Sequence, residues 1–303
     1  MKKHLILPLL GIVVLLFAGC EKEEFTRPAF VHLDAIVLQP NGNHIFFNDP
    51  GMLTSEVVAV YVVTHRPGAS KVDTIGLFQL PCTIPILYSG KLDYIEFYPA
   101  IEQSGSSLGL PFYTFYNRIR HEGCTLVSHD TLNFGTDTTT YNLVREDMRI
   151  FINFEPPAEN IYFDSTVLKY ASGATADACT GQGYGYVHVT PDRTSIDFDL
   201  ERTFYVPDPT KLVYLELDTR SDLDFQVYMK SRYTSGGAID RQPVMVVRKS
   251  STWQHLYINL GRTWAWFNHY EDFSLSFTAL NPDEKDGDIR LDNMRVLTTS
   301  VVL

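Results

Sequence analysis

Ser195-Ile196-Asp197-Phe198-Asp199-Leu200-Glu201 alternates between polar and apolar side chains for seven residues. Because successive side chains of a β-strand point to opposite faces, this alternation predicts a strand with one apolar face turned to a core. The other face carries the carboxylates of Asp197, Asp199 and Glu201. We interpret these carboxylates as a solvated strand face rather than as a cation site. The stretch therefore predicts a half-buried strand.

Segments of similar composition recur on both sides of this stretch. They lie at 30–38, 55–64, 73–80, 92–98, 148–154, 211–218, 225–229, 243–247, 253–260, 273–279 and 289–297. They are rich in valine, isoleucine and aromatic residues, which favour strands. No long window after the first 20 residues shows helical spacing, so helix is expected only in single turns. The chain is predicted to be all-β.

A proline-containing break at 155–160 divides these segments into two groups. We predict an N-terminal β-sandwich, Ig-like or related, over residues 30–145. A second β-sandwich follows over 158–303, and residues 146–157 form a linker or a last strand. The sequence thus predicts two β-sandwich domains of ordinary size.

The first 19 residues have the features of a signal peptide. Two lysines precede an apolar run from Leu5 to Phe17, and these 13 residues are too short for a membrane span. As a helix they would cover about 20 Å, whereas the hydrocarbon core is ~30 Å thick. The run ends in Ala18-Gly19-Cys20, which resembles the lipobox of bacterial lipoproteins, although Phe17 stands where that motif most often has leucine. The resemblance implies cleavage before Cys20 and attachment of palmitate-type acyl chains to it.

The resemblance continues beyond the cysteine. Lys22-Glu23-Glu24 is similar to the export signal of surface-exposed lipoproteins in Bacteroidota-type bacteria, and residues 20–29 would form the lipidated N-terminus and tether. A plain charged tether is the alternative interpretation. The resemblance implies a lipid-anchored outer-membrane protein that faces the cell exterior.

The composition limits the partners. The formal net charge is −11, and it becomes more negative when the lysines of the signal are removed. Such a chain is unsuited to nucleic acid or to gripping anionic headgroups, so the expected membrane contact is through the acyl chains alone. Of the 4 cysteines, Cys82, Cys124 and Cys179 remain once Cys20 carries lipid. A disulfide between Cys82 and Cys124 and a set of buried thiols both remain open.

A block in the first domain resembles uncharacterised Bacteroidota lipoproteins. It comprises Gly76-Leu77-Phe78-Gln79-Leu80-Pro81 and Thr83-Ile84-Pro85-Ile86-Leu87, and the aromatic cluster 111–116 fits the same pattern. The resemblance brings no biochemical assignment. Since neither Pro81 nor Pro85 can donate a ladder hydrogen bond, we expect this segment at the edge of a sheet.

Three strands of the second domain resemble the galactose-binding-like jelly rolls, which include many carbohydrate-binding modules. The matching stretches are Tyr214-Leu215-Glu216-Leu217, residues 252–260 and Leu291-Asp292-Asn293-Met294. The resemblance implies a jelly roll over about residues 158–300. The resemblance also implies, as an alternative to a protein without cofactors, a structural calcium ion with Asp288 and Asp292 among its ligands.

No signature of a hydrolase, metalloprotease, nucleotide-binding loop or dinucleotide fold is present, so the protein is not expected to be an enzyme. Gly181-Gln182-Gly183-Tyr184-Gly185 has the glycine content of a phosphate loop without a following helix, and we interpret it as a loop.

The best candidates for ligand contact are Trp264, Trp266 and Tyr270, because exposed rings can stack on the apolar faces of sugars. The alternative is that they close the sandwich core, which is also our interpretation of Trp253. Two functions follow. One is a surface binding module for glycans, and the other is a lipoprotein subunit docked on an outer-membrane transport, secretion or assembly complex.

Overall fold

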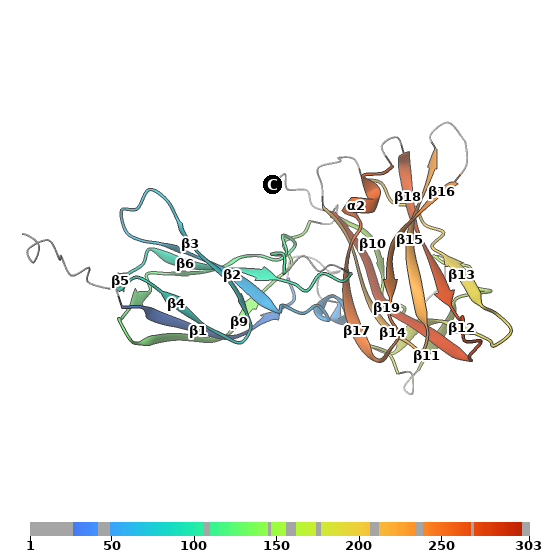
Figure 1. Cartoon of the computed structure of the whole chain (residues 1–303), viewed down its shortest axis with the longest axis horizontal. Coiled ribbons are helices and arrows are strands. Elements are labelled where there is room, and N and C mark those ends of the chain that lie inside the picture. The colour runs from blue at the N-terminus through green and yellow to red at the C-terminus, as the bar shows by residue number, and fades with distance from the viewer. Residues whose placement is uncertain are drawn as a thin grey trace, which may run out of the picture.

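The computed structural model describes residues 27–41, 49–105, 110–144, 147–155, 162–173, 177–206, 212–233, 239–267 and 270–298. In these ranges strands predominate, and the helices are the single turns η2 (Pro50–Leu53) and α2 (Gly261–Trp264). Figure 1 shows two strand-built bodies joined end to end. Within the described ranges, no helix combines the length and the hydropathy that a membrane crossing requires. The all-β prediction, with two β-sandwiches and helix only in single turns, is confirmed.

In the described residues, the N-terminal body has nine strands in three sheets. Their bounds are β1 Ala29–Leu38, β2 Ala59–His65, β3 Asp73–Gln79, β4 Cys82–Ile86, β5 Gly90–Lys91, β6 Tyr94–Ala100, β7 Ile119–Glu122, β8 Thr125–Leu126 and β9 Thr131–Thr139. One sheet has the order β4-β1-β9, with β1 parallel to β9 and antiparallel to β4. The second has the antiparallel order β3-β2-β6-β7, and β5 pairs with β8. Apolar residues of the larger two sheets pack together as one core.

Strand β4 lies at the edge of its sheet, as Pro81 and Pro85 predict. Cys82 and Cys124 are free thiols that pack against the N-terminal core. Burial raises the pKa of both thiols. The structure therefore contains packed thiols, not the proposed disulfide.

The C-terminal body is a sandwich of two sheets. One has the order β11-β12-β19-β14-β17, with β10 paired to β19, and the other has the order β13-β18-β15-β16. Their bounds are β10 Met148–Ile152, β11 Lys169–Ser172, β12 Gly183–Val189, β13 Ser195–Asp199, β14 Val213–Ser221, β15 Asp224–Tyr233, β16 Ile239–Val247, β17 Ser250–Asn259, β18 Tyr270–Leu280 and β19 Gly287–Thr298. Strand β10 thus joins the second sandwich.

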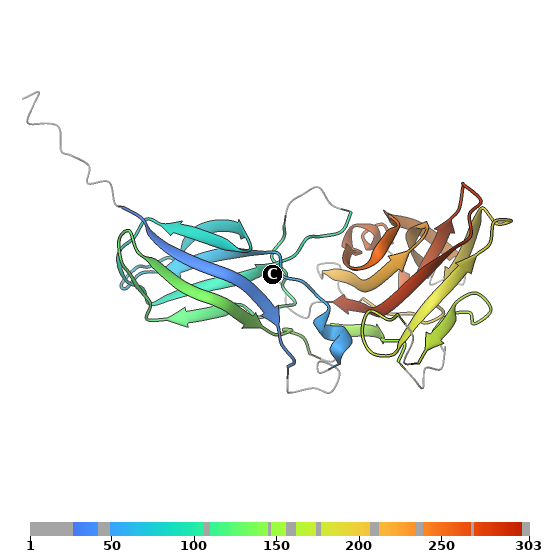
Figure 2. The same ribbon diagram turned by 90° about the horizontal axis from the view of Figure 1, so that it is seen from below.

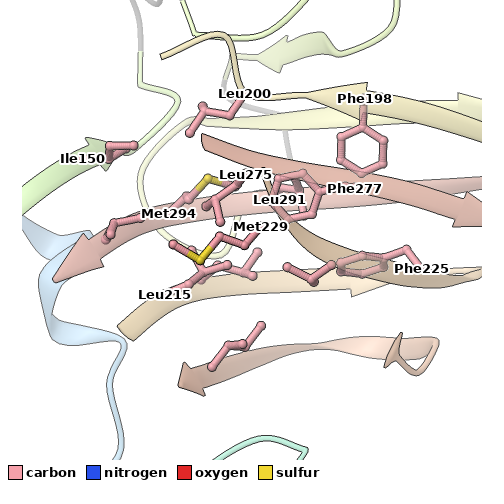
Figure 3. Close-up of a cluster of buried hydrophobic side chains, with 14 of the residues drawn as sticks. Ile150, Phe198, Leu200, Leu215, Phe225, Met229, Leu275, Phe277, Leu291 and Met294 are labelled. Atoms are coloured by element: carbon pink, nitrogen blue, oxygen red, sulfur yellow. The ribbon is translucent and has the colours of Figure 1, made fainter. Parts of the chain in front are cut away.

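The core between these sheets receives alternate side chains of both (Figure 3). Leu215 and Leu291 come from one sheet, and Phe225 and Phe277 come from the other. Of the loop expected at 181–185, residues 181–182 form a turn, whereas residues 183–185 belong to strand β12. A Cβ on Gly185 would lie 2.5 Å from the ring of Phe154, so glycine permits a close approach that a side chain would prevent.

The two bodies meet at the outer face of the sheet that contains β14, β17 and β19. Figure 2 shows turn η2 between them. Tyr113, Tyr141 and Met52 of the N-terminal body form one buried cluster with Tyr214 and Tyr257 of the C-terminal body. The described part of the N-terminal body therefore covers one half of this sheet face and leaves the other half uncovered.

Candidate functional site

A row of large side chains crosses the open half of this sheet face. Tyr186 of β12 is in register with Arg290 of β19, which is in register with Arg220 of β14. The guanidinium of Arg220 lies 5.9 Å from the ring centre of Trp253 on β17. All four side chains are half-buried. We call Tyr186, Arg290, Arg220 and Trp253 the open row.

Side chains of the two outer strands, β12 and β17, reach toward each other across this face. Strands β12 and β17 are separated by β19 and β14, so their backbones lie about 14 Å apart at ~4.8 Å per strand. Nevertheless, the rings of Tyr184 and Trp253 meet edge to face with 6.1 Å between their centres. The Nε1 of Trp253 also donates to the carbonyl of Asp177 at 3.2 Å. Trp253 is thus held in one orientation above the sheet.

The arginines of the open row are held by carboxylates. Arg290 donates to Asp288 at 3.0 Å, and Arg220 forms a short ion pair with Asp177. Each arginine side chain is 20% exposed. The Nε of Arg290 is buried and lacks a hydrogen-bond partner among the described residues. The row therefore offers fixed donors beside aromatic rings, with its charges largely balanced.

The covered half of the face is organised by Arg295, whose side chain is 0% exposed. It donates to Glu216 on the neighbouring strand at 2.5 Å. It also reaches the N-terminal body, where it donates to the carbonyl of Gly51 at 2.6 Å, to the hydroxyl of Ser55 at 2.6 Å and to that of Tyr141 at 2.8 Å. A buried guanidinium needs such a complete set of acceptors. The guanidinium of Arg295 therefore links the two bodies through its hydrogen bonds.

Glu216 remains ionised in this setting. Burial alone would raise its pKa, but the charge of Arg295 and a hydrogen bond from His255 outweigh burial and lower the pKa to about 2. Tyr141 donates to the same carboxylate at 2.8 Å, and Tyr113 donates through a short hydrogen bond. A Cβ on Gly51 would meet Asn293 at 1.9 Å, so a glycine is needed where turn η2 packs against β19.

A second buried group adjoins this ion pair. His255 donates to Asp218 at 2.7 Å, and Asn293 donates to the other oxygen of Asp218 at 2.7 Å. Burial lowers the pKa of His255, but the neighbouring carboxylates of Asp218 and Glu216 outweigh burial and raise it. Asn293, with φ 48°, lies where the register with β14 shifts. This bulge keeps both Asp292 and Arg295 on the outer face.

A pocket of about 650 Å³ lies where the open row meets the N-terminal body. Its C-terminal wall is the edge strand β17 from Trp253 to Tyr257, and its other wall is formed by residues 56–58 and 102–105. A smaller pocket of about 460 Å³ lies on the opposite sheet, with Asp199 and Glu201 in its lining. There Asp199 pairs with Lys230 at 2.7 Å and Asp197 pairs with Arg241 at 3.2 Å. Two of the three carboxylates predicted on this strand face, Asp197 and Asp199, are thus paired with basic side chains of other strands in the same sheet.

The predicted stacking surface is not assembled as expected. Trp264 ends helix α2, is 9% exposed and packs edge-on against Phe273 in the core. Trp266 is 79% exposed, and the side chain of Tyr270 lies outside what the structure describes. Trp264 lies in a helical turn and Trp266 follows it, so the two rings do not share one face. Trp264 is a core residue, and its assignment to a ligand surface is wrong.

The proposed calcium ligands have separate partners. Asp288 is held by Arg290 and by His188, which donates at 2.9 Å. Asp292 is buried and accepts from the backbone N–H groups of Cys179 at 3.1 Å, Thr180 at 3.2 Å and Asn293 at 2.8 Å. Across the described ranges, no group of three or more His, Cys, Asp or Glu residues is arranged to hold a metal ion. These residues do not form a calcium ligand set, and calcium binding remains a prediction from the resemblance.

Burial also sets the protonation of Asp292. It raises the pKa of this carboxyl to about 8, although the backbone donors act in the opposite direction. Burial raises the pKa of the adjacent Cys179 to about 12, so this thiol is a poor nucleophile. The predicted lipidation and export residues, Cys20 and Lys22-Glu23-Glu24, lie outside the described residues.

No protein-family model matches the chain, and no curated protein matches it. Among solved structures, the xylan-binding CBM22-1 domain of Paenibacillus barcinonensis Xyn10C is similar with 12% identity and a TM-score of 0.39, covering 51% of this chain and 96% of that one. A structure from a study of the promiscuous specificity of carbohydrate-binding modules of the β-sandwich superfamily is similar with 12% identity and a TM-score of 0.39. This match covers 90% of this chain and 99% of that one. The family 11 module of Clostridium thermocellum Lic26A-Cel5E has 13% identity and a TM-score of 0.32, covering 50% and 96%. The chain's own strand order, rather than these likenesses, establishes its β-sandwich fold.

Proposed function

We propose that the protein is a non-catalytic glycan-binding module and that the open row is its ligand face. The supporting observation is the row itself. Rings at both ends and two arginines between them lie half-buried across four strands, on the part of the sheet that the N-terminal body leaves open. Aromatic rings bury the apolar face of a sugar, while donors of fixed direction bind its hydroxyl groups.

Trp253 is the residue on which this proposal depends most. Its ring is oriented by Asp177 and Tyr184, so little side-chain entropy remains to be lost on binding. If stacking on a sugar follows the scale known for bases, Trp253→Ala should cost about 1–3 kcal/mol of binding free energy. That loss corresponds to roughly a 5- to 150-fold weaker dissociation constant.

The test is a glycan array followed by isothermal titration with the best-bound glycan. Trp266→Ala is the matched control, since it removes the same ring from a position that is 79% exposed in the turn after α2. We expect Trp253→Ala to lose the array signal while its melting temperature shows a folded protein. Loss of binding in Trp266→Ala, with Trp253→Ala unaffected, would move the site to the turn that contains Trp266. Absence of any bound glycan would refute the proposed function.

We further propose that the module is anchored in the outer membrane by acyl chains on Cys20 and faces the cell exterior. The proposal is supported by Ala18-Gly19-Cys20 and by Lys22-Glu23-Glu24. One acyl chain gives only reversible binding, whereas further chains make release negligible. In this arrangement the N-terminal sandwich would stand between the lipid and the ligand face.

One observation supports the alternative, a docked subunit of an outer-membrane complex. Tyr61 is paired with Leu77 and with Tyr98 on the outer face of the β3-β2-β6-β7 sheet. Phe112 packs edge-on against Tyr61 and Tyr98 and is 44% exposed. Exposed apolar patches of this kind favour protein contacts. If docking is the function, Phe112→Ser should remove a partner that co-purifies with the wild-type protein from detergent-solubilised membranes, and unchanged co-purification would argue against it.

A further inference from the structure

The pocket beside Trp253 is shared by both bodies. The C-terminal body contributes the edge strand β17, while the N-terminal body contributes the residues of two short segments. These are Glu56, Val58, Glu102, Gln103, Ser104 and Gly105. A ligand that stacks on Trp253 and extends past the edge of the sheet must therefore enter a space that the first domain helps to form.

The N-terminal wall of this pocket is tied to β17. The backbone N–H of Ser104 donates to the carbonyl of Tyr257 at 2.9 Å, and the N–H of Tyr257 donates back to the Ser104 hydroxyl at 3.1 Å. The N–H of Glu56 donates to the Tyr257 hydroxyl at 2.8 Å. Because both segments are attached to the same strand, the wall keeps a fixed position relative to Trp253.

Gln103 has a defined orientation in this wall. The amide of Asn259 is fixed because its Oδ1 accepts from the N–H of Gly261 at 2.8 Å. Its Nδ2 therefore faces Gln103, whose Oε1 accepts from Asn259 at 3.4 Å and from the Tyr214 hydroxyl at 2.8 Å. With Oε1 occupied in this way, the Nε2 of Gln103 is the donor available to a ligand.

The charge of the pocket is acidic. Glu56 and Glu102 are both exposed at its lining. Among the described lining residues, His255 is the one basic side chain, and it is held by Asp218 at 2.7 Å. Carboxylates accept hydrogen bonds from sugar hydroxyls but repel a second anion, and the repulsion is strongest where water is partly excluded.

We infer that this pocket receives the sugar unit next to Trp253 and makes the site selective for neutral over acidic glycans, with the N-terminal domain supplying the selecting groups. The inference rests on the proposed function, because it assigns the charge preference of the same ligand face. The residues that it assigns are different, because Glu56, Glu102 and Gln103 lie outside the open row.

The test compares two forms of each neutral polysaccharide that the array identifies and that carries primary hydroxyl groups. Affinity is measured for the neutral polymer and for the same polymer after oxidation of those hydroxyl groups to carboxylates. We expect the wild-type protein to bind the neutral form at least about tenfold more tightly, a ratio equivalent to ~1.4 kcal/mol. Glu56→Gln/Glu102→Gln should reduce the ratio severalfold by raising affinity for the oxidised form. Glu122→Gln/Glu201→Gln removes the same charge from exposed positions outside this pocket and should leave the ratio unchanged.

The outcomes separate the two proposals. A wild-type protein that binds no glycan refutes the proposed function and this inference with it. Equal affinity for neutral and oxidised polymers, with binding still dependent on Trp253, overturns the inference alone. The same conclusion follows if both double variants change the ratio equally, because net charge would then be the cause. Gln103→Ala should weaken binding of the neutral polymer while the melting temperature stays near the wild-type value, and unchanged affinity would contradict a role for this wall.

Discussion

Arg295→Met is expected to weaken the contact between the two sandwiches more than any single surface change. The substitution keeps much of the side-chain volume but removes a guanidinium that is 0% exposed. It leaves Glu216 buried without its cation and leaves the carbonyl of Gly51 without its donor. The loss therefore falls on both sides of the contact.

The magnitude follows from burial. Removing one partner of a buried ion pair costs about 3–5 kcal/mol, which is a large fraction of the ~5–15 kcal/mol that stabilises a typical domain. We expect the unfolding midpoint of the C-terminal body to fall by roughly 10 °C, at ~2–4 °C per kcal/mol for a domain of that size. Glu216→Gln/Arg295→Met should recover part of the loss, since it also removes the unpaired charge.

Differential scanning calorimetry measures this effect. Arg248→Met is the control, because Arg248 is 81% exposed and its pair with Asp224 should contribute at most about 1 kcal/mol. In Arg295→Met, the two bodies are expected to melt in separate steps if their contact is what makes them unfold together. A loss no greater than that of Arg248→Met would show that the buried pair does not hold the bodies together.

Three further outcomes are expected. Burial raises the pKa of Asp292 from 3.8 to about 8, so the folded protein retains a proton that the unfolded chain releases. The stability that this proton contributes is complete below pH 3.8 and is lost as the pH rises through about 8. Urea unfolding should therefore show stability falling across this range, with a smaller fall in Asp292→Asn; equal slopes would exclude Asp292 as the cause. Cys20→Ala should abolish acylation, and labelled palmitate incorporated at the wild-type level would contradict the lipobox assignment. Replacing Lys22-Glu23-Glu24 by alanines should leave the lipoprotein facing the periplasm, so unchanged protease shaving of intact cells would exclude the export signal.

The strand content could be predicted from sequence because it depends on local alternation. The segment 195–201 forms β13 over Ser195–Asp199, and the proline-rich segment forms the edge strand β4. Trp264 was predicted at a ligand surface, but residues 261–264 form a helical turn in which its ring packs into the core. A helix of four residues leaves no periodic pattern to detect.

The open row could not be predicted, because it depends on the pairing of distant strands. Arg220 and Arg290 are adjacent through the β14–β19 register, although 70 residues separate them in sequence. The Arg295 contact with Ser55 spans 240 residues and depends on how two domains meet. One signal was available: the alternation of Trp253, His255 and Tyr257 places them on one face with polar groups, which is unusual for a core face.

Hydrogen–deuterium exchange with and without the best-bound glycan tests the central claim most directly, because it maps the ligand onto the fold. The open row and the shared pocket predict slower exchange in β12, in residues 250–256 of β17 and in residues 102–105, with α2 and the β3-β2-β6-β7 sheet unchanged. Protection confined to residues 261–267 or to the N-terminal sheet, with β17 unaffected, would contradict the assignment of the glycan to the Trp253 face.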